Sequence, residues 1–199
     1  GTPRQDAFRR DFTVNALYFD PVSKSSEVID FVGGLDDIDA KLVRTIGEPD
    51  RRIEEDPVRM LRACYLQGQY EFRPEPELES VICARADSLA LASQARLMEE
   101  LFKVLKKPFA HPVLQACHNY GLFDYFLPGM AGCWTTDSGE FCQDLLKARD
   151  RALLNGEIYP SRITGLVHLT LAFVETVVGD GDSDRLWKSR AGVEREVQD

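Results

Sequence analysis

The chain changes its sequence pattern at residues 50–66, which read DRRIEEDPVRMLRACYL. Before this stretch, short β-branched and aromatic runs alternate with Gly, Pro and Asp. After it, apolar residues recur at the spacings of three and four that are typical of helices. Pro57 suits the first turn of a helix, where no N–H is lost, and Asp56 is the expected N-cap. The pattern predicts an α+β fold, mostly α, in which a small β-containing piece leads into an all-helical remainder.

The residues before this change predict a small sheet. Residues 11–19 and 27–32 are rich in β-branched and aromatic side chains, and the segment between them begins with an Asp-Pro turn signal. The two runs therefore predict a hairpin. The glycine pair at 33–34 ends the second strand. We expect a short helix at 35–40 and a third short strand at 42–46.

Helical spacing continues along most of the remaining chain. We expect helices at 110–119, 140–154 and 162–178, with a loop at 129–139. The Gly-Asp run at 179–184 is expected to end the packed region, and the polar residues after it are expected to fray. The apolar positions that carry the helical period in the middle of the chain are Leu61, Tyr65, Leu66, Leu78, Val81, Ile82, Leu97, Leu101, Val104 and Leu105.

Composition excludes a membrane-spanning protein and a disulfide scaffold. Hydrophobic residues make up 44% of the 199 residues, enough for a sizeable core, and charged residues make up 29%. No apolar run approaches the roughly 18 residues of a spanning helix, so we expect no membrane partner. The five cysteines lack CxxC spacing. They predict reduced thiols, mostly in the core, of a cytoplasmic protein.

The charge pattern predicts a mixed cleft rather than a basic surface. A net charge of −9 argues against a protein that coats nucleic acid, because such binding depends on cations that displace counterions. Acidic residues interleave with the arginines of the N-terminal third, so we expect only modest RNA affinity. Those arginines are Arg4, Arg9, Arg10, Arg44, Arg51, Arg52, Arg59 and Arg62.

A first polar cluster consists of Arg9, Arg10, Asp11 and Asn15. If residues 11–17 form a strand, Asp11 and Asn15 share one of its faces. Arginine offers a rigid fork for phosphate, while Asp and Asn can bind the hydroxyl pair of a ribose. The alternative is an edge strand with a solvated polar face, and spacing alone does not separate the two.

A second cluster consists of Glu55, Asp56, Arg59 and Arg62, at helical spacings of three and four. A carboxylate beside a guanidinium presents acceptors and donors together, as side chains do when they read base edges. The alternative is an N-cap with an ordinary helix ion pair, worth a few tenths of a kcal/mol. Taken alone, the second cluster favours that alternative.

The pair Asp37-x-Asp39 has the spacing with which two carboxylates hold Mg²⁺ for phosphoryl transfer. That chemistry needs both carboxylates on a strand, facing one way. Here the pair follows a Gly-Gly break and precedes Ala40-Lys41, so it is expected in the first turn of a short helix, stabilised by the helix dipole. We therefore predict no metal ligands at this pair.

Taken together, the motifs are similar to those of the bacterial tRNA nucleotidyltransferase/poly(A) polymerase family (class II). The resemblance extends over residues 1–128, whereas residues 129–199 show only a compatible helical character. Five motifs in family order make the resemblance specific. They are RRDFTVNAL at 9–17, IDFVGGLDD at 29–37, RTIG at 44–47, EDPVRMLRA at 55–63 and RLMEELFKVL at 96–105.

The resemblance implies untemplated addition of nucleotides to the 3′ end of an RNA, either an mRNA or a tRNA. ATP would be the substrate and Mg²⁺ the metal. Three parts are implied: the end of a nucleotidyltransferase head at 1–48, a helical neck at 49–107 and a helical body at 108–199. The chain is most similar to poly(A) polymerase, with CCA addition as the alternative. A non-catalytic RNA- or protein-binding module also stays open.

The resemblance also implies roles for individual residues. Arg9, in the first motif, would be one of the nucleotide-binding residues. Arg10, Asp11 and Asn15 would hold the sugar and phosphates of the incoming nucleotide. The base edge would meet Asp56 and Arg59, braced by Glu55 and Arg62. Support of the neck or the RNA primer would come from Arg96 and Glu99.

Two departures from the family pattern stand out. The family's Gly-Ser loop and metal-binding Asp-x-Asp precede the Arg-Arg-Asp motif, and they are absent from these 199 residues. The resemblance thus implies a recognition fragment without catalytic residues, inactive in isolation. After Ala63 the family usually continues with Val-Arg-Phe, whereas this chain has Cys64-Tyr65-Leu66, which removes a helix cation.

Overall fold

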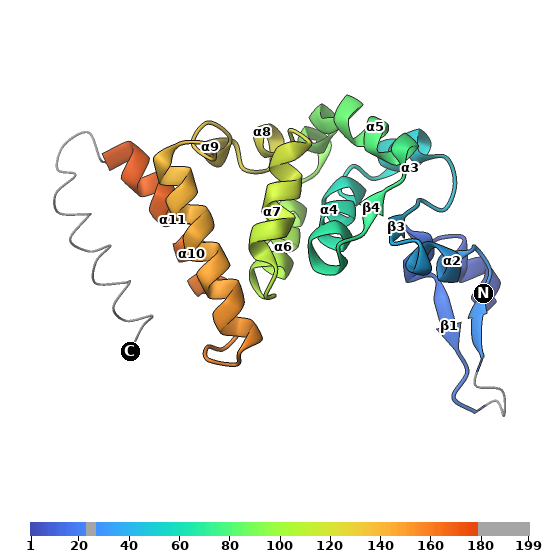
Figure 1. Ribbon diagram of the computed structural model, residues 1–199. Coiled ribbons are helices and arrows are strands. Elements are labelled where there is room, and N and C mark those ends of the chain that lie inside the picture. Colours follow the sequence, from blue (N-terminus) through green and yellow to red (C-terminus); the bar gives the residue numbers. More distant parts are fainter. Residues whose placement is uncertain (23–26, 179–199) are drawn as a thin grey trace.

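The computed structural model describes residues 1–22 and 27–178. Its elements follow one another from a β-hairpin at the N-terminal end to a pair of long helices at the other end (Figure 1). Strands are few and short, and helices dominate, so the predicted α+β, mostly α fold is confirmed. No helix in these two ranges combines the length and apolar character needed to cross a bilayer.

The N-terminal part contains the predicted hairpin in a shorter form. Strand β1 (Leu17–Phe19) pairs antiparallel with β2 (Val28–Asp30), with Leu17 opposite Asp30. Helix α2 (Gly34–Asp39) and strand β3 (Leu42–Val43) follow where the sequence predicts them. The remaining element is the short helix α1 (Pro3–Ala7). Positions 23–26 of the predicted turn lie outside the described residues.

The predicted strand at 11–17 is wrong. Phe12, fully buried, forms a single bridge to Thr45, and Thr13–Asn15 form a 3₁₀ turn. The turn packs against α2: Thr13 Oγ1 donates to Asp37 Oδ2 at 2.6 Å, and a Cβ on Gly34 would lie 2.3 Å from the Thr13 carbonyl oxygen. This contact with α2 overrides the local β propensity. Asp11, Thr13 and Asn15 therefore do not share one strand face.

The middle of the chain is helical, as predicted. Strand β4 (Arg73–Pro74) pairs parallel with β3 and so attaches the helices to the N-terminal part. A 3₁₀ segment at Ala86–Leu91 precedes the sixth helix. The helices are α3 (Pro49–Glu55), α4 (Arg59–Tyr70), α5 (Pro76–Ala84), α6 (Gln94–Leu105) and α7 (Ala110–Asn119).

A kink separates α3 from α4, and Asp56 lies in it. Asp56 is extended, with φ −151°, and Val58 rather than Asp56 is the N-cap of α4. Asp56 Oδ1 still accepts a hydrogen bond from the Val58 N–H at 3.3 Å. Pro57 explains the break, because its ring disfavours helical geometry at the preceding residue. The predicted N-cap is therefore wrong, and the second cluster belongs to two helices rather than one.

Of the three predictions for residues 129–178, the two helices are confirmed and the loop is not. Helix α10 (Asp137–Leu154) and α11 (Arg162–Val178) lie where helical spacing placed them. The predicted loop at 129–139 is wrong in part, because α9 (Pro128–Ala131) and the first residues of α10 occupy it. Preceding them is α8 (Phe123–Phe126). The predictions for residues 179–199 lie outside the described residues.

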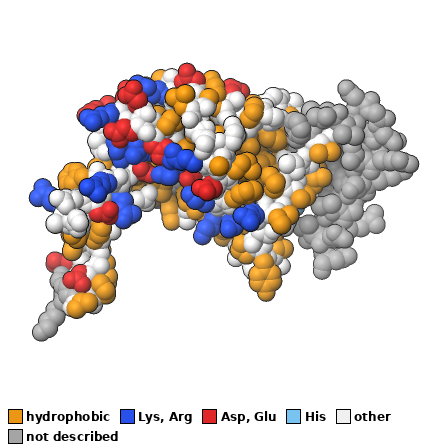
Figure 2. Space-filling view, turned by 180° about the vertical axis from the view of Figure 1, so that it is seen from behind, with side chains coloured by type: hydrophobic (Ala, Val, Ile, Leu, Met, Phe, Trp, Pro, Cys, Tyr) orange, Lys and Arg blue, Asp and Glu red, His pale blue; other side chains and the backbone are white. Residues whose placement is uncertain are grey.

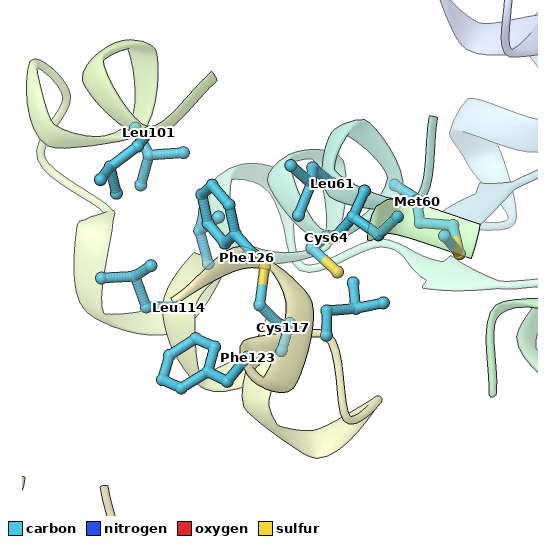
Figure 3. Packing of buried hydrophobic residues seen from close by; sticks show 14 of the residues in the cluster. Met60, Leu61, Cys64, Leu101, Leu114, Cys117, Phe123 and Phe126 are labelled. Carbon is cyan, nitrogen blue, oxygen red and sulfur yellow. The ribbon is translucent and has the colours of Figure 1, made fainter. Parts of the chain in front are cut away.

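The main hydrophobic core forms where α4, α6, α7 and α8 meet (Figure 3). Cys64 of α4 and Cys117 of α7 are both buried there, and all five cysteines are free thiols, as predicted. Helices α4 and α7 approach closely at Gly68, where a Cβ would lie 2.6 Å from the Val113 nitrogen. Only glycine fits at this crossing, so the position of α4 is fixed by its contact with α7.

A buried ion pair joins α10 to the ends of two other helices. Arg149, with 1% of its side chain exposed, pairs with Asp150 at 3.0 Å and donates hydrogen bonds to the carbonyl oxygens of Leu105 and Lys107. Asp150 Oδ2 in turn accepts from the His111 N–H at 2.9 Å. We call Arg149 and Asp150 the α10 clamp. It holds the end of α6 and the start of α7 together.

Candidate functional site

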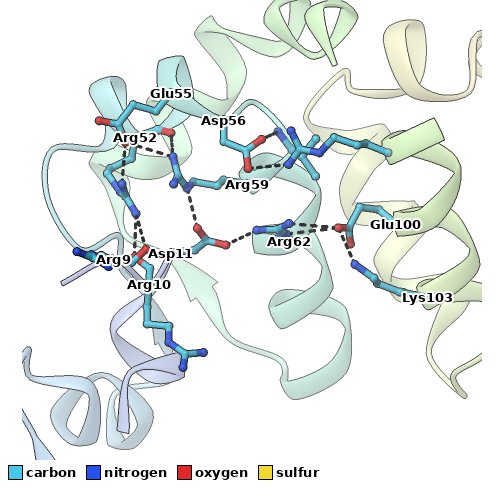
Figure 4. A network of polar contacts seen from close by, with 12 residues as sticks. Arg9, Arg10, Asp11, Arg52, Glu55, Asp56, Arg59, Arg62, Glu100 and Lys103 are labelled. Atoms are coloured by element: carbon cyan, nitrogen blue, oxygen red, sulfur yellow. Dashed lines mark hydrogen bonds and ion pairs between the residues drawn. The ribbon is translucent and has the colours of Figure 1, made fainter. Parts of the chain in front are cut away.

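Asp11 is the centre of a network of charged side chains (Figure 4). Its Oδ1 accepts a hydrogen bond from Arg59 Nε at 2.7 Å, and its Oδ2 accepts one from Arg62 Nη1 at 2.5 Å. Asp11 lies just before the 3₁₀ turn, whereas both arginines lie on the first turn of α4. The structure thus brings members of the two sequence clusters into direct contact.

Arg52 attaches the kink between α3 and α4 to the N-terminal backbone. Its Nη2 donates to the Arg10 carbonyl oxygen at 2.8 Å, and its Nη1 pairs with Glu55 at 2.7 Å. Glu55 also lies 3.5 Å from Arg59, which donates to the Arg52 carbonyl oxygen. Sequence reasoning counted Arg52 among the arginines but gave it no role, because its contact lies 42 residues away.

Helix α6 supplies the other side of the network. Arg96 pairs with Asp56 at 2.9 Å, and Glu100 lies 3.4 Å from Arg62 and 2.9 Å from Lys103. Glu99, the predicted site residue, is exposed and forms no ion pair within the described part of the chain. Its neighbour Glu100 makes the contact instead. No local spacing separates the two glutamates, because Glu99 and Glu100 lie four and three residues before Lys103, both of which are helical spacings.

The remaining residues of the first cluster lie apart from Asp11. Arg10 pairs with Asp6 at 2.8 Å, and Asp6 also accepts from the Tyr18 hydroxyl, so the Arg10 side chain points away from Asp11 (Figure 4). Arg9 is exposed, and no ion pair of its side chain is found among the described residues. Asn15 is exposed beside a cavity that Arg62 also lines.

The arginines keep Asp11 ionised. Partial burial raises the pKa of the Asp11 carboxyl, but hydrogen bonds and charge from Arg59 and Arg62 outweigh it, so the pKa is lower than usual. A hydrogen bond from Arg52 likewise lowers the pKa of Glu55. Both groups are anions at neutral pH, suited to orienting guanidinium groups rather than to exchanging protons.

The acidic residues of the site do not fit a metal ion. Asp11, Glu55 and Asp56 are each paired with at least one arginine. Asp37 is buried in α2, where it accepts from Thr13 and pairs with Arg44 at 3.1 Å, so its role is structural. It lies in the first turn of α2 as predicted, whereas Asp39 ends that helix. In the described ranges, no three His, Cys, Asp or Glu side chains cluster as metal ligands.

The charged network spans the regions that two known families match. The family described as "Poly A polymerase head domain" matches residues 1–44, and the family described as "Probable RNA and SrmB- binding site of polymerase A" matches residues 71–133. Asp11 lies in the first region and Glu100 in the second. Arg59 and Arg62 lie between the two regions: each contacts Asp11, and Arg62 also contacts Glu100. Figure 2 shows the mixed charges on the N-terminal half of one face, with hydrophobic side chains nearer the C-terminal helices.

Proteins of two kinds are similar to the chain. It is 35% identical over 146 residues to poly(A) polymerase I of Haemophilus influenzae, which covers 73% of this chain and 32% of that protein. It is 39% identical over 129 residues to a CCA-adding enzyme of Bacillus licheniformis, with 65% and 32% covered. The chain thus spans about a third of the length of these curated relatives.

A solved structure agrees with these relatives. The crystal structure of the Bacillus stearothermophilus CCA-adding enzyme in complex with CTP matches with a TM-score of 0.59 and 33% identity. The match covers 74% of this chain and 35% of that one. Similarity in sequence and similarity in fold therefore point to the same group of proteins.

Proposed function

The chain belongs to the bacterial tRNA nucleotidyltransferase/poly(A) polymerase family, and from this we propose that it is the nucleotide- and RNA-recognising part of an RNA 3′-end nucleotidyltransferase. The complete protein would add AMP from ATP to an RNA 3′ end without a template. Residues 1–48 would end the head, 49–107 would form the neck and 108–199 the body. A cytoplasmic location would suit these substrates.

The observation that carries this proposal is the fixed geometry of Asp56 and Arg59 at the kink. Asp56 is held by Arg96 of α6, and Arg59 by Asp11 and Glu55, so an acceptor and a donor are oriented before any ligand binds. Among the described residues, no hydrogen bond of Arg59 Nη2 is found, so this nitrogen is the one we propose to donate to the base. Such preorganisation lowers the entropy lost on binding.

Asp56 and Arg59 present a hydrogen-bond acceptor and a donor side by side, which matches the edges of two bases. On its Watson–Crick edge, adenine offers an amino donor and a ring-nitrogen acceptor, and cytosine offers the same pattern. Asp56 would accept from the amino group while Arg59 donates to the ring nitrogen. Guanine and uracil present the opposite polarity at these positions. The proposed pair therefore selects ATP and CTP over GTP and UTP.

The first cluster would bind the rest of the nucleotide. Arg9 is free to contact phosphate, and Arg10 can join it by exchanging its exposed pair with Asp6, which is weak because both partners are half exposed. Asn15 would contact the sugar. Both oxygens of Asp11 are engaged by arginines, so its proposed role is to position Arg59 and Arg62. Mg²⁺ is the proposed metal of the complete protein, held by none of the carboxylates described above.

Removing the proposed acceptor should weaken the selection of the base. In the protein expressed from the complete reading frame, Asp56→Ala is expected to reduce the preference for ATP and CTP over GTP and UTP by about 5- to 150-fold, because a good bidentate base contact contributes about 1–3 kcal/mol of discrimination. The measurement is kcat/KM for each nucleotide in RNA primer extension. A ratio of constants is used because it is insensitive to the amount of folded enzyme.

Two further variants sharpen this experiment. Arg51→Ala removes an exposed cation of the neighbouring helix and should retain the preference for ATP and CTP. Arg96→Ala removes the partner that orients Asp56 and should lower the preference, but by less than Asp56→Ala does. An unchanged preference in Asp56→Ala would reject base reading by this residue.

CCA addition is the second candidate function. It is favoured by the similarity to the Bacillus licheniformis enzyme, which is as close in identity as the poly(A) polymerase. The two differ in product: a poly(A) polymerase extends many RNAs with ATP alone, whereas CCA addition needs CTP and stops after a short defined sequence. Sequencing the products made on a tRNA without its CCA end, with both nucleotides present, separates them.

A further inference from the structure

A cavity opens between α4 and α6, next to the charged network. Its volume is about 440 Å³, within the range of sites that take one small ligand. Arg62 lies on its wall and also contacts Asp11, so the cavity adjoins the proposed nucleotide site without including Asp56 or Arg59. Of the residues given roles under the proposed function, Asn15 and Arg62 line it, and the rest of its lining has been given none.

Cations dominate the charged lining of this cavity. Arg62, Lys103, Lys106 and Lys107 face a single carboxylate, Glu100, in a chain whose net charge is −9. Glu100 already pairs with Arg62 and Lys103. Lys106 and Lys107 are exposed and form no ion pair within the part of the chain that is described. A local excess of positive charge in an acidic protein indicates an anionic ligand.

The backbone that carries Lys106 and Lys107 is held in place by the α10 clamp. Arg149 donates to the carbonyl oxygens of Leu105 and Lys107, which flank Lys106 at the end of α6. The two free ammonium groups therefore extend from a fixed backbone. Their position at a helix C-terminus also stabilises them, because the helix dipole is negative there.

Two tyrosines supply an aromatic surface in the same cavity. Tyr65 is half-buried, and its ring is fixed edge-on against Phe109 at 5.3 Å. Tyr70 is 50% exposed and lies against Phe72 at 5.8 Å. Aromatic side chains beside cations are the combination with which proteins bind single-stranded nucleic acid, because every base has a face that can stack.

We infer that this cavity binds the terminal nucleotides of a single-stranded RNA 3′ end, with Lys106 and Lys107 on the phosphates and Tyr65 or Tyr70 under a base. The inference rests on the proposed function and names the place of its primer. A cavity of this size admits an unstacked base with its phosphate, whereas a duplex keeps its bases stacked. Through Arg62, the bound RNA end would lie beside the incoming nucleotide.

The charge contribution is tested by RNA binding without nucleotide or metal. The probe is a fluorescent single-stranded RNA of about 12 nucleotides, and anisotropy is measured over a series of salt concentrations. Lys106→Gln with Lys107→Gln should weaken binding about tenfold or more at low salt. It should also reduce the slope of log K against log salt by about 1.4, since each phosphate contact on a single strand contributes about 0.7.

The matched control is Lys41→Gln with Lys147→Gln, two exposed lysines that do not line the cavity. This variant should bind the RNA as the unmodified chain does.

The aromatic contribution has its own matched pair. Tyr70→Ala should weaken binding about tenfold, and Tyr70→Phe should restore it, because stacking needs the ring and not the hydroxyl.

Equal losses of RNA affinity in the Lys106/Lys107 variant and in its lysine control, or no loss in either, would overturn the inference. So would displacement of the RNA by ATP alone, which would make the cavity a site for the free nucleotide. Loss of base preference in Asp56→Ala is measured separately, so either proposal can fail while the other stands.

Discussion

Replacing Arg149 with methionine is expected to lower the free energy of unfolding by about 3–5 kcal/mol, the range seen when one partner of a buried ion pair is removed. Asp150 would keep a buried charge without its cation, and the carbonyl oxygens of Leu105 and Lys107 would lose their donor. Burial already raises the pKa of Asp150 and lowers that of Arg149, which shows how unfavourable either charge is alone. Urea unfolding of the chain followed by circular dichroism measures the loss.

Arg151 provides the control for this substitution, because it lies on the same helix but is exposed. Arg151→Met should leave the urea midpoint nearly unchanged. A double variant, Arg149→Met with Asp150→Asn, removes both charges, keeps an acceptor for the His111 N–H, and should recover part of the loss. A loss under about 1 kcal/mol in Arg149→Met would contradict the clamp.

Asp11→Asn is expected to lower the free energy of unfolding by about 2 kcal/mol, and the kcat/KM for nucleotide addition by the complete protein about 100-fold. The asparagine keeps the shape but leaves Arg59 and Arg62 without their shared anion. The stability figure is below the range for fully buried pairs because the Arg62 side chain is 35% exposed. Misplaced arginines would lose their alignment with the nucleotide, which accounts for the larger effect on rate.

The pH dependence separates this charge effect from a packing effect. Since the arginines lower the pKa of Asp11, its stabilising contribution is complete above the ordinary Asp pKa of about 4 and is lost as the pH falls through the lowered value. The stability difference between the unmodified chain and Asp11→Asn should thus be constant from about pH 5 to 8 and shrink below about pH 4. Asp6→Asn, at an exposed pair, is the control and should change the urea midpoint little.

Much of the helical fold could be predicted because its signals are local. Helix α7 has the predicted bounds, and α11 has them too, since each is specified by apolar spacing within its own residues. The 3₁₀ turn at Thr13–Asn15 could not be predicted in this way. Its conformation depends on Asp37, 24 residues away, and on the close approach of Gly34.

The sequence predicts which residues belong to the candidate site better than it predicts how those residues contact one another. Asp11, Arg59 and Arg62 were expected as recognition residues from motif order, but not as an ion network, because their contacts join residues 48 and 51 positions apart. Glu100 was missed for the same reason. The kink at Asp56 is different, since the restriction that Pro57 places on its neighbour was visible in the sequence.

Helix α4 fixes the distance between the two proposed ligand sites. Arg59 stands at its first residue and Tyr65 six residues later, which corresponds to a rise of about 9 Å along the axis. Because Gly68 locks α4 against α7, neither end can shift without the other. The offset between the base being selected and the RNA end receiving it is therefore set by helical pitch. A single residue inserted between Arg62 and Tyr65 would turn the tyrosines by about 100° relative to the arginines and take the two ligands out of register.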